Sequence, residues 1–305
     1  MSNYVFVNGR LVSEKRACIS VKDRGFLYGD GLFETIRSYK GYVFSLNSHV
    51  DRLFTSLRIL GYRINFDKQY LCNSLYKTLK ANRLERNDAY IKIIVTRGRY
   101  EGKLSFNSSS VANIVIITSL LKPYPSEYYR KGIKVISSSI RRDSLRNQLY
   151  THKLLNYFEN VFARNEAYTQ GAVEALFLTR DYLVLEGATS NIFLVKNGTV
   201  YTPPLTQNIL PGITRDVVID ICKENNIKVK ERKLHYFDIV ESSEVFLTNS
   251  IMEVMPVSEV DTHKIGAGVP GDCTRMLMEL YGKRVNKDKD KEKENKENIF
   301  LVEQV

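Results

Sequence analysis

The sequence predicts a protein of the α+β or α/β class with two domains. Its 305 residues suggest two domains by length, and short apolar runs of strand character are mixed with amphipathic helical patterns in both halves. Between the halves, Lys122-Pro123-Tyr124-Pro125 interrupts the periodicity, because two prolines break helices and hold the chain extended. We therefore expect a small α+β domain over residues 1–120, a linker over 121–130 and a larger domain over 131–284.

The first domain is expected to place strands beside helices. Asn8-Gly9 and Lys40-Gly41 each separate two short apolar runs, as in hairpins with tight turns. Apolar residues at helical spacing follow Ser48, a plausible N-cap, and stop at Gly61. The expected elements are hairpins at 4–12 and 33–46, helices at 48–60 and 68–82, and strands at 89–96 and 111–118.

The second domain is expected to be richer in strands. Its expected elements are a strand at 133–137, a helix at 150–168, strands at 175–179, 182–185, 192–195 and 199–202, a helix from about 213, strands at 227–231, 244–248 and 254–257, and a helix at 270–284. The remaining segment, 285–305, is a charged tail that carries little apolar surface before its last residues. We expect that tail to be disordered.

Composition and charge argue against several classes of function. The net charge is +11, but the basic residues are spread along the chain without a nucleic-acid-binding motif, so no nucleic-acid partner is expected. No apolar run approaches the roughly 20 residues that cross a membrane, and the chain starts with a strand pattern rather than a signal peptide. We expect a cytoplasmic protein. Its four cysteines and four histidines show no clustered spacing, so neither disulfides nor a metal site is expected.

The most informative stretch runs from residue 186 to 215, EGATSNIFLVKNGTVYTPPLTQNILPGITR. It opens with the carboxylate of Glu186 beside a flexible Gly187-Ala188-Thr189 segment. It closes with Gly212-Ile213-Thr214 at the start of an amphipathic helix. The first N–H groups of a helix lack partners within it, so such a start either binds a phosphate or is an ordinary cap.

The whole string resembles the class IV aminotransferases, the pyridoxal 5'-phosphate enzymes of fold type IV. This family includes branched-chain aminotransferases, D-amino-acid aminotransferases and aminodeoxychorismate lyases. The segment 28–35, YGDGLFET, is similar to the same family. Over about residues 1–282, the resemblance implies a small α+β domain, a larger domain with a β-barrel-like sheet, the cofactor at the interface between them, and a homodimer.

The resemblance also implies roles for individual residues. In the family, the glutamate contacts the pyridine nitrogen of the cofactor and the Ile-Thr pair holds its phosphate, which implies these roles for Glu186, Ile213 and Thr214. An anionic partner keeps the ring nitrogen protonated, as the chemistry requires. The string HVDRL at 49–53 matches the segment whose arginine binds the phosphate, so Arg52 is expected there.

The segment 152–161, HKLLNYFENV, resembles the family's lysine-bearing segment. It implies that Lys153 holds the cofactor as a Schiff base and carries the α-proton. Tyr157 is expected at the cofactor's phenolic oxygen, or alternatively in the core. In TNSIMEV, at 248–254, Ser250 is expected at the phosphate or the substrate carboxylate.

The exact reaction is less well defined by these motifs. D-amino-acid enzymes and lyases place a carboxylate-binding arginine shortly after a Thr-Arg-Gly string, and here that position is Gly102. The string contains Arg97, and Arg99 or Lys103 could replace the missing arginine. Phe33 stands where D-amino-acid enzymes have a tyrosine, which argues against that subgroup.

Two further motifs bear on the choice between the remaining subgroups. Lys-x-Leu-Asn at 153–156 and the Asn249-Ser250 pair look more like lyases, so Asn249 is a candidate substrate residue. The general motifs are common among aminotransferases. We therefore expect amino-group exchange between an amino acid, of the branched-chain type, and a 2-oxo acid, with 4-amino-4-deoxychorismate lyase as the alternative.

Overall fold

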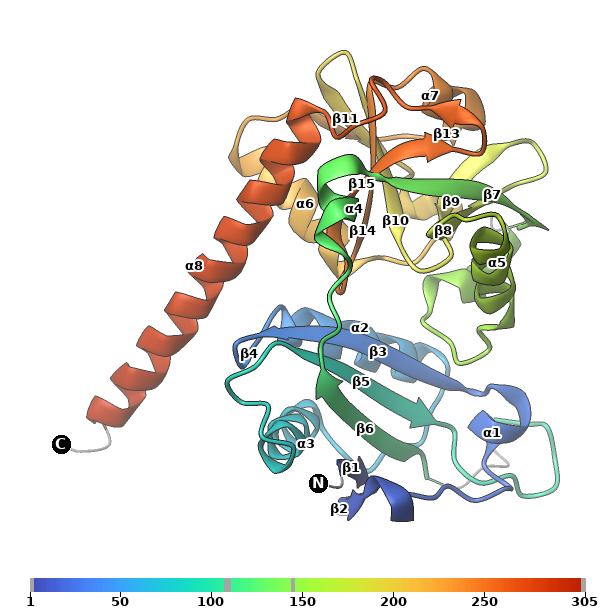
Figure 1. The fold of residues 1–305 in the computed structure, drawn as a ribbon. Coiled ribbons are helices and arrows are strands. Elements are labelled where there is room, and N and C mark those ends of the chain that lie inside the picture. Colours follow the sequence, from blue (N-terminus) through green and yellow to red (C-terminus); the bar gives the residue numbers. More distant parts are fainter. Residues whose placement is uncertain (1–2, 107–110, 144–145, 303–305) are drawn as a thin grey trace. The chain divides into compact units, whose positions relative to one another are not determined.

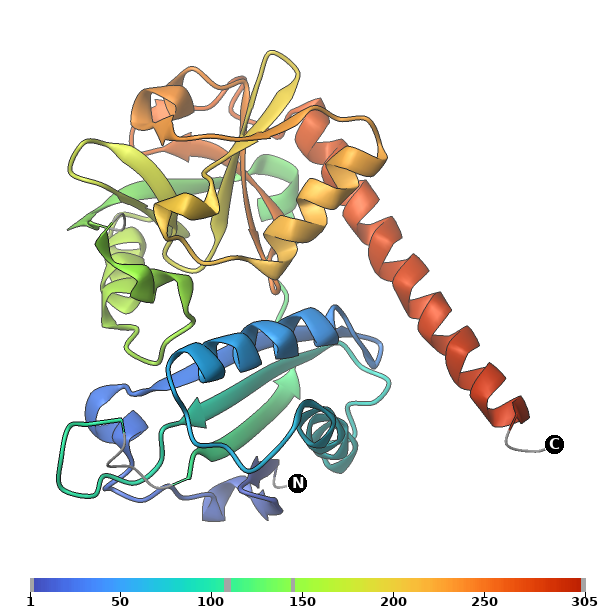
Figure 2. The same ribbon diagram turned by 180° about the vertical axis from the view of Figure 1, so that it is seen from behind.

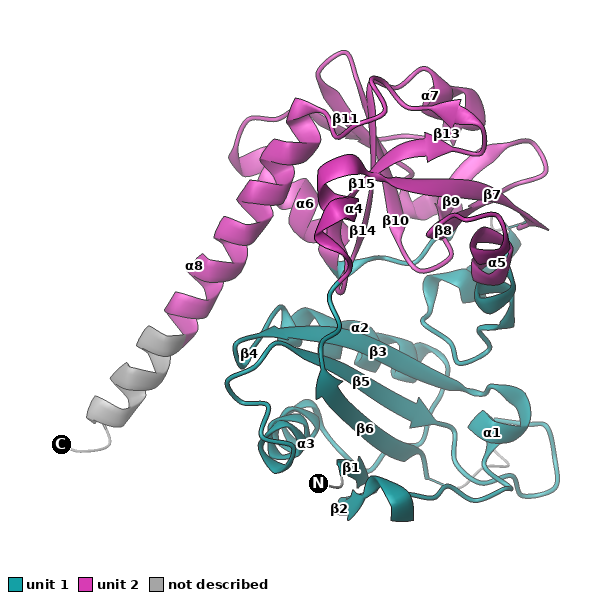
Figure 3. Cartoon of the chain, in the orientation of Figure 1, with its two compact units in different colours: residues 1–123, 143–162, 208–213 teal, residues 124–142, 163–207, 214–305 magenta. Residues whose placement is uncertain are grey.

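The structure, a computed structural model, describes residues 3–106, 111–143 and 146–302, with side chains as far as residue 292 (Figure 1). The chain forms two compact units (Figure 3). The first comprises residues 1–123, 143–162 and 208–213, and the second comprises 124–142, 163–207 and 214–305. The first break falls inside the expected linker, but two later segments return to the first unit.

The first unit contains a six-stranded antiparallel sheet in the order β2-β1-β6-β5-β3-β4. Its strands are β1 Tyr4–Val7, β2 Arg10–Ser13, β3 Gly31–Tyr39, β4 Tyr42–Val43, β5 Ala89–Thr96 and β6 Asn113–Leu120. Helices α2 (Leu46–Ile59) and α3 (Lys68–Ala81) pack on one face of this sheet. Figure 2 shows the sheet from the side that α2 covers. A short helix, α1 (Arg24–Tyr28), precedes β3.

Alternation along β5 decides which side chains enter the core of the first unit. Ala89, Ile91, Ile93 and Val95 are fully buried in the cluster that includes Leu53 of α2. The even-numbered residues of β5 therefore occupy the opposite face of the sheet. The register of β3 and β5 places residues 33 and 35 on that same face, directly across from residues 94 and 92.

The second unit contains a ten-stranded mixed sheet in the order β12-β11-β10-β14-β15-β7-β8-β9-β13, with β16 attached to β15. Its strands are β7 Ile133–Arg141, β8 Glu174–Leu178, β9 Leu183–Gly187, β10 Asn191–Lys196, β11 Thr199–Thr202, β12 Val229–Glu231, β13 Leu234–His235, β14 Glu244–Asn249, β15 Glu253–Val260 and β16 His263–Lys264. Four strands separate β9 from β10 in this order, yet the two pack against each other. The sheet is therefore curled, as the expected barrel-like sheet requires.

The helices of the second unit surround this sheet. They are α4 (Ser126–Lys131), α7 (Tyr236–Val240), α8 (Asp272–Val302), most of α5 (Phe158–Thr169) and all but the first residue of α6 (Ile213–Glu224). In the part of the chain that the structure describes, no helix is both long and apolar enough to cross a membrane.

Two expected elements differ from the structure. A helix starting at residue 150 is wrong, because α5 begins at Phe158 and the preceding residues form a 3-10 turn and an extended segment. That segment is held by β3, which overrides its local helical pattern. The charged segment after residue 284, expected to be disordered, is helical in α8 as far as Val302. Opposite charges three residues apart, such as Lys287 with Asp290 and Lys289 with Glu292, favour that helix.

Candidate functional site

Lys153 lies in an extended segment that pairs with the first residues of β3. The N–H of Phe33 donates to the carbonyl of Lys153 at 2.9 Å, and the N–H of Leu155 donates to the carbonyl of Gly31 at 2.8 Å. Leu32 and Leu154 form the bridge between these two bonds. The backbone of Lys153 is thus fixed on both sides, although the residue lies outside regular secondary structure.

This close pairing explains the glycines of the Gly29-Asp30-Gly31 string. A Cβ atom on Gly29 would lie 3.0 Å from the backbone of Asn156. One on Gly31 would lie 2.4 Å from the Leu155 side chain and 2.9 Å from the carbonyl oxygen of Val95. The two glycines therefore make room for the lysine-bearing segment.

The side chain of Lys153 extends over an aromatic pair. Its Nζ lies 4.6 Å from the ring centroid of Phe33 and 5.9 Å from that of Tyr157. The two rings meet edge to face, with centroids 5.2 Å apart. The structure thus brings together three predicted residues: Lys153, Tyr157 and Phe33.

A fourth residue at this place, Lys92, was missed by sequence reasoning. Its Nζ lies 4.8 Å from the Phe33 centroid, and burial lowers the pKa of the Lys92 ammonium. The residue occupies the face of β5 that points away from the core, among the half-buried even positions. A single lysine inside the apolar run at 89–95 was the signal that could have identified it.

Arg52 is held on α2 by a buried carboxylate of β3. Its Nε donates to Glu34 Oε1 at 2.9 Å and its Nη2 donates to Oε2 at 2.5 Å, while His49 Nδ1 lies 2.8 Å from Oε2. Burial raises the pKa of Glu34, but Arg52 and His49 outweigh that effect and bring it from 4.5 to about 2. Glu34 is therefore ionised near neutral pH, and it fixes the guanidinium in one orientation.

The remaining Arg52 contact points to the start of α6. Arg52 Nη1 donates to the carbonyl oxygen of Pro211 at 2.8 Å, two residues before Ile213 begins the helix. Gly212 and Thr214 are buried at this helix start. Arg52 is thereby joined to the segment of its own unit that leads into α6.

Glu186, in the second unit, is paired with an arginine. It lies in β9 opposite Phe177 and is 7% exposed. Arg142, which directly follows β7, donates from Nη1 to Glu186 Oε1 at 3.2 Å, and its guanidinium lies 3.4 Å from the Phe177 ring centroid. Sequence reasoning missed Arg142, although two arginines at the end of an apolar strand, at 141 and 142, were a signal.

Asn249, a candidate substrate residue, forms hydrogen bonds within and beyond its own turn. Its Oδ1 accepts from the N–H groups of Ile251 and Met252 at 2.9 and 2.8 Å, and its Nδ2 donates to the carbonyl of Thr189 at 3.0 Å. These bonds shape the turn between β14 and β15, on which Ser250 lies half-buried. Asn249 therefore supports this turn, and its contact with the substrate stays a prediction.

Arg97, another candidate substrate residue, is held within the first unit by several contacts. It is 2% exposed, its Nε donates to Asp30, and its Nη1 donates to two backbone carbonyls. Its guanidinium lies between the rings of Tyr62 and Phe106, 4.0 and 3.9 Å from their centroids. Arg99 and Lys103 are exposed on the following loop, where the backbone of Arg99 bridges to Asp23.

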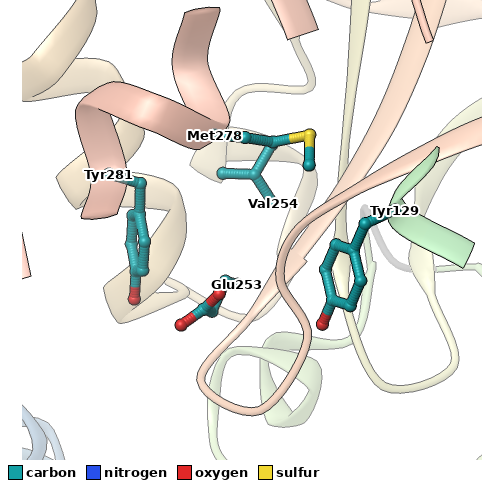
Figure 4. A pocket seen from close by; sticks show the side chains of 5 residues that line it. All are labelled: Tyr129, Glu253, Val254, Met278 and Tyr281. Carbon is teal, nitrogen blue, oxygen red and sulfur yellow. The ribbon is translucent and has the colours of Figure 1, made fainter. Parts of the chain in front are cut away.

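A separate cavity of about 260 Å³ lies in the second unit, between α4, β15 and α8. Its lining residues are Tyr129, Glu253, Val254, Met278 and Tyr281 (Figure 4). None of them is a predicted site residue, so we do not assign this cavity to the site. Among the described residues, no group of three or more His, Cys, Asp or Glu side chains is placed to hold a metal ion.

Comparisons with known proteins identify the family of the chain. The model of the amino-transferase class IV family matches residues 31–260. The chain is 40% identical over 277 residues to a putative branched-chain-amino-acid aminotransferase of Methanocaldococcus jannaschii, covering 91% of this chain and 94% of that protein. It is 32% identical over 281 residues to the aminodeoxychorismate lyase of Bacillus subtilis, covering 92% and 94%.

Solved structures give the same result. The branched-chain amino acid aminotransferase of Escherichia coli superposes with a TM-score of 0.86 at 28% identity, covering 91% of this chain and 93% of that one. D-alanine aminotransferases, such as that of Bacillus licheniformis, are also relatives, at 33% identity over 274 residues that cover 90% of this chain and 94% of that protein.

Proposed function

Since the chain belongs to the class IV aminotransferases, we propose that it uses pyridoxal 5'-phosphate to exchange an amino group between a branched-chain amino acid and a 2-oxo acid. The observation that carries the proposal is the placement of Lys153. Its amine lies over Phe33 in the unit where Arg52 and the start of α6 meet. The relative of Methanocaldococcus jannaschii supports the branched-chain substrate class.

The donor set suits this cofactor. A primary amine is what the cofactor's aldehyde requires, and we assign that amine to Lys153. For the phosphate we assign Arg52, Ile213, Thr214 and Ser250, because a fixed guanidinium and a helix start both favour a dianion. Glu186 supplies the negative charge that a protonated pyridine nitrogen requires.

In the proposed mechanism, the cofactor when bound supplies an electron sink for the α-carbon of the substrate. Lys153 removes the α-proton and later returns a proton, since it lies on a backbone that hydrogen bonds hold in place. Glu186, kept in place by Arg142, stabilises positive charge at the ring nitrogen. Tyr157 is proposed to donate to the cofactor's phenolic oxygen.

The substrate is proposed to lie against Phe33. The ring offers an apolar surface for a branched side chain, and its lack of a hydroxyl group argues against the D-amino-acid subgroup. Lys92, on the same face of the sheet, offers a cation for a substrate carboxylate. This role replaces the one expected of Arg97.

A second candidate, elimination of pyruvate from 4-amino-4-deoxychorismate, is supported by the lyase of Bacillus subtilis and by the Lys-x-Leu-Asn motif at 153–156. The same proton transfer by Lys153 serves both reactions. Only the fate of the substrate's carbon skeleton separates them.

We further propose a cytoplasmic homodimer. The first unit exposes large apolar side chains on α1 and at the start of α5: Phe26, Leu27, Phe158, Val161 and Phe162. Large apolar side chains exposed in this number favour burial in a protein interface. The described cysteines are all free thiols, which fits a reducing compartment.

The test is a titration of the purified protein with pyridoxal 5'-phosphate, followed by absorbance, with Lys153→Ala as the control. We expect an absorbance band from cofactor joined to the lysine in the wild type and none in the variant. L-leucine, L-glutamate, D-alanine and aminodeoxychorismate are then added separately. Formation of a 2-oxo acid from L-leucine supports the proposal, whereas pyruvate released only from aminodeoxychorismate supports the lyase. The absence of cofactor binding would refute both.

A further inference from the structure

Glu174 is a fully buried carboxylate that the proposed mechanism does not use. It begins β8 and is 0% exposed. Its Oε2 accepts from the N–H and the hydroxyl of Thr189, at 3.2 and 2.5 Å, and from the hydroxyl of Ser190 at 3.4 Å. Its Oε1 accepts from the N–H of Ala175 at 3.0 Å, and Arg164 Nη1 forms an ion pair with Oε2 at 3.5 Å. Burying a charge costs free energy unless hydrogen bonds and ion pairs offset the loss of water, as they do for Glu174. A carboxylate at such a position is therefore a candidate for a specific role.

Thr189 and Ser190, which donate to Glu174 Oε2, belong to the turn that directly follows Glu186. The turn is closed by the N–H of Gly187, which donates to the carbonyl of Ser190 at 2.7 Å. A Cβ atom on Gly187 would lie 2.2 Å from Ser190 Oγ and 3.3 Å from Glu174 Cγ. The carboxylate and the turn are therefore packed together with no space for a different arrangement.

The same turn is joined to the turn that carries Ser250. The carbonyl of Thr189 accepts from Asn249 Nδ2 at 3.0 Å, while Asn249 Oδ1 accepts from two N–H groups of its own turn. Glu174 thus holds Thr189, and Thr189 holds Asn249. One carboxylate supports the two turns next to Glu186 and Ser250.

We propose that Glu174 is a positioning residue that fixes Glu186 and Ser250 for the cofactor's ring nitrogen and phosphate. The inference rests on the proposed function. An ionised carboxylate suits this position because it accepts only, and both groups of Thr189 donate to one of its oxygens. A glutamine has the same shape, but it has only one oxygen, so it cannot accept from Thr189 on one side and from the N–H of Ala175 on the other.

The test compares Glu174→Gln with Glu244→Gln as a matched control. Glu244 accepts from the N–H and the hydroxyl of Thr274, at 2.7 and 2.6 Å, and from the N–H of Cys273 at 3.1 Å. These bonds hold the start of α8 and involve neither turn. Glu244→Gln therefore removes the same charge and the same kind of hydrogen bonds as Glu174→Gln. It should lower stability without changing the proposed cofactor site.

For each variant we would measure the Kd for pyridoxal 5'-phosphate, the absorbance spectrum of the bound cofactor, and Tm. We expect a lower Tm in both variants. Only Glu174→Gln is expected to weaken cofactor binding, by about tenfold or more, and to alter the spectrum, because bonds to a charged group are worth about one factor of ten in an equilibrium. Equal cofactor affinity and spectra in the two variants would show that Glu174 is merely structural.

If Glu174→Gln fails to fold, Thr189→Val decides the question. This variant keeps the side-chain shape and removes one donor, and we expect cofactor binding about threefold weaker than in the wild type. Unchanged binding would overturn the inference. If the wild type itself does not bind the cofactor, the proposed function falls and this inference falls with it.

Discussion

Replacement of Glu34 by glutamine removes the charge that holds Arg52 and His49. Because the pKa of Glu34 falls from 4.5 to about 2 on folding, its ionisation favours the folded state at pH values above 4.5. Each pKa unit corresponds to about 1.4 kcal/mol, so the carboxylate contributes about 3 kcal/mol to the free energy of unfolding at pH 7. Glu34→Gln is expected to lose this amount, as is usual when one partner of a buried ion pair is removed.

The change in stability with pH tests this reasoning more directly than the loss of stability at pH 7. The wild type loses its Glu34 contribution as the pH falls from 4.5 toward 2, and about 2 of the 3 kcal/mol are gone at pH 3. The stability of Glu34→Gln lacks this dependence, so the two proteins approach each other in acid. Urea unfolding of both apoproteins between pH 7 and pH 3, followed by circular dichroism, measures the difference.

The control for this experiment is Glu127→Gln. Glu127 is exposed on α4 and pairs with Lys131, and because such an exposed pair contributes little, Glu127→Gln leaves stability almost unchanged at every pH. A constant difference between the wild type and Glu34→Gln from pH 7 to pH 3 would refute the reasoning, because the effect would then not depend on the charge of Glu34.

Three further predictions concern single positions. Gly31→Ala puts a Cβ atom 2.9 Å from a backbone oxygen, so it should displace the Lys153 segment and lower kcat at least about tenfold in steady-state kinetics. Its control is Gly282→Ala, whose Cβ atom meets nothing within 4 Å, and which should stabilise α8 by up to about 1 kcal/mol and so raise Tm. Lys92→Gln should raise KM for the 2-oxo acid about tenfold. Because burial lowers the pKa of Lys92, the wild-type KM should begin to rise at a lower pH than the pH at which an exposed lysine loses its charge. A KM that changes neither with pH nor with this substitution would exclude Lys92 from carboxylate binding. Arg97→Met should cost about 3 to 5 kcal/mol in urea unfolding with KM nearly unchanged, and a selective rise in KM would restore its expected role in substrate binding.

Much of the fold could be predicted because the spacing of apolar residues along the sequence indicates which side chains are buried. The alternation at 89–96 and the helical spacing at 48–60 both follow from which side chains enter the core, and both elements are present. The segment at 150–157 was misjudged because its conformation depends on hydrogen bonds to β3, more than a hundred residues earlier in the chain. Local propensity carries no information about such a partner.

The site was predictable to the extent that its residues belong to contiguous strings. Arg52 and Lys153 each lie in one, and the structure gives each a fixed environment. The strand patterns carried a signal for Arg142 and Lys92 but did not indicate their partners, because only the pairing of strands brings them to Glu186 and Phe33. The surroundings of Arg97 could not be predicted for the same reason, since the carbonyls that accept from its guanidinium come from a distant turn.

The pairing of the Lys153 segment with β3 also limits how the protein can be divided. β4 pairs with β3 only at Ser38 and Tyr39, so the opposite end of that edge is covered by residues 153–155. A fragment ending at residue 123 would lack this cover and would expose unpaired N–H and C=O groups, a template for aggregation. Residues 1–123 are therefore not expected to fold well on their own. Lys153, the residue proposed for catalysis, also covers the open edge of the sheet in its own unit.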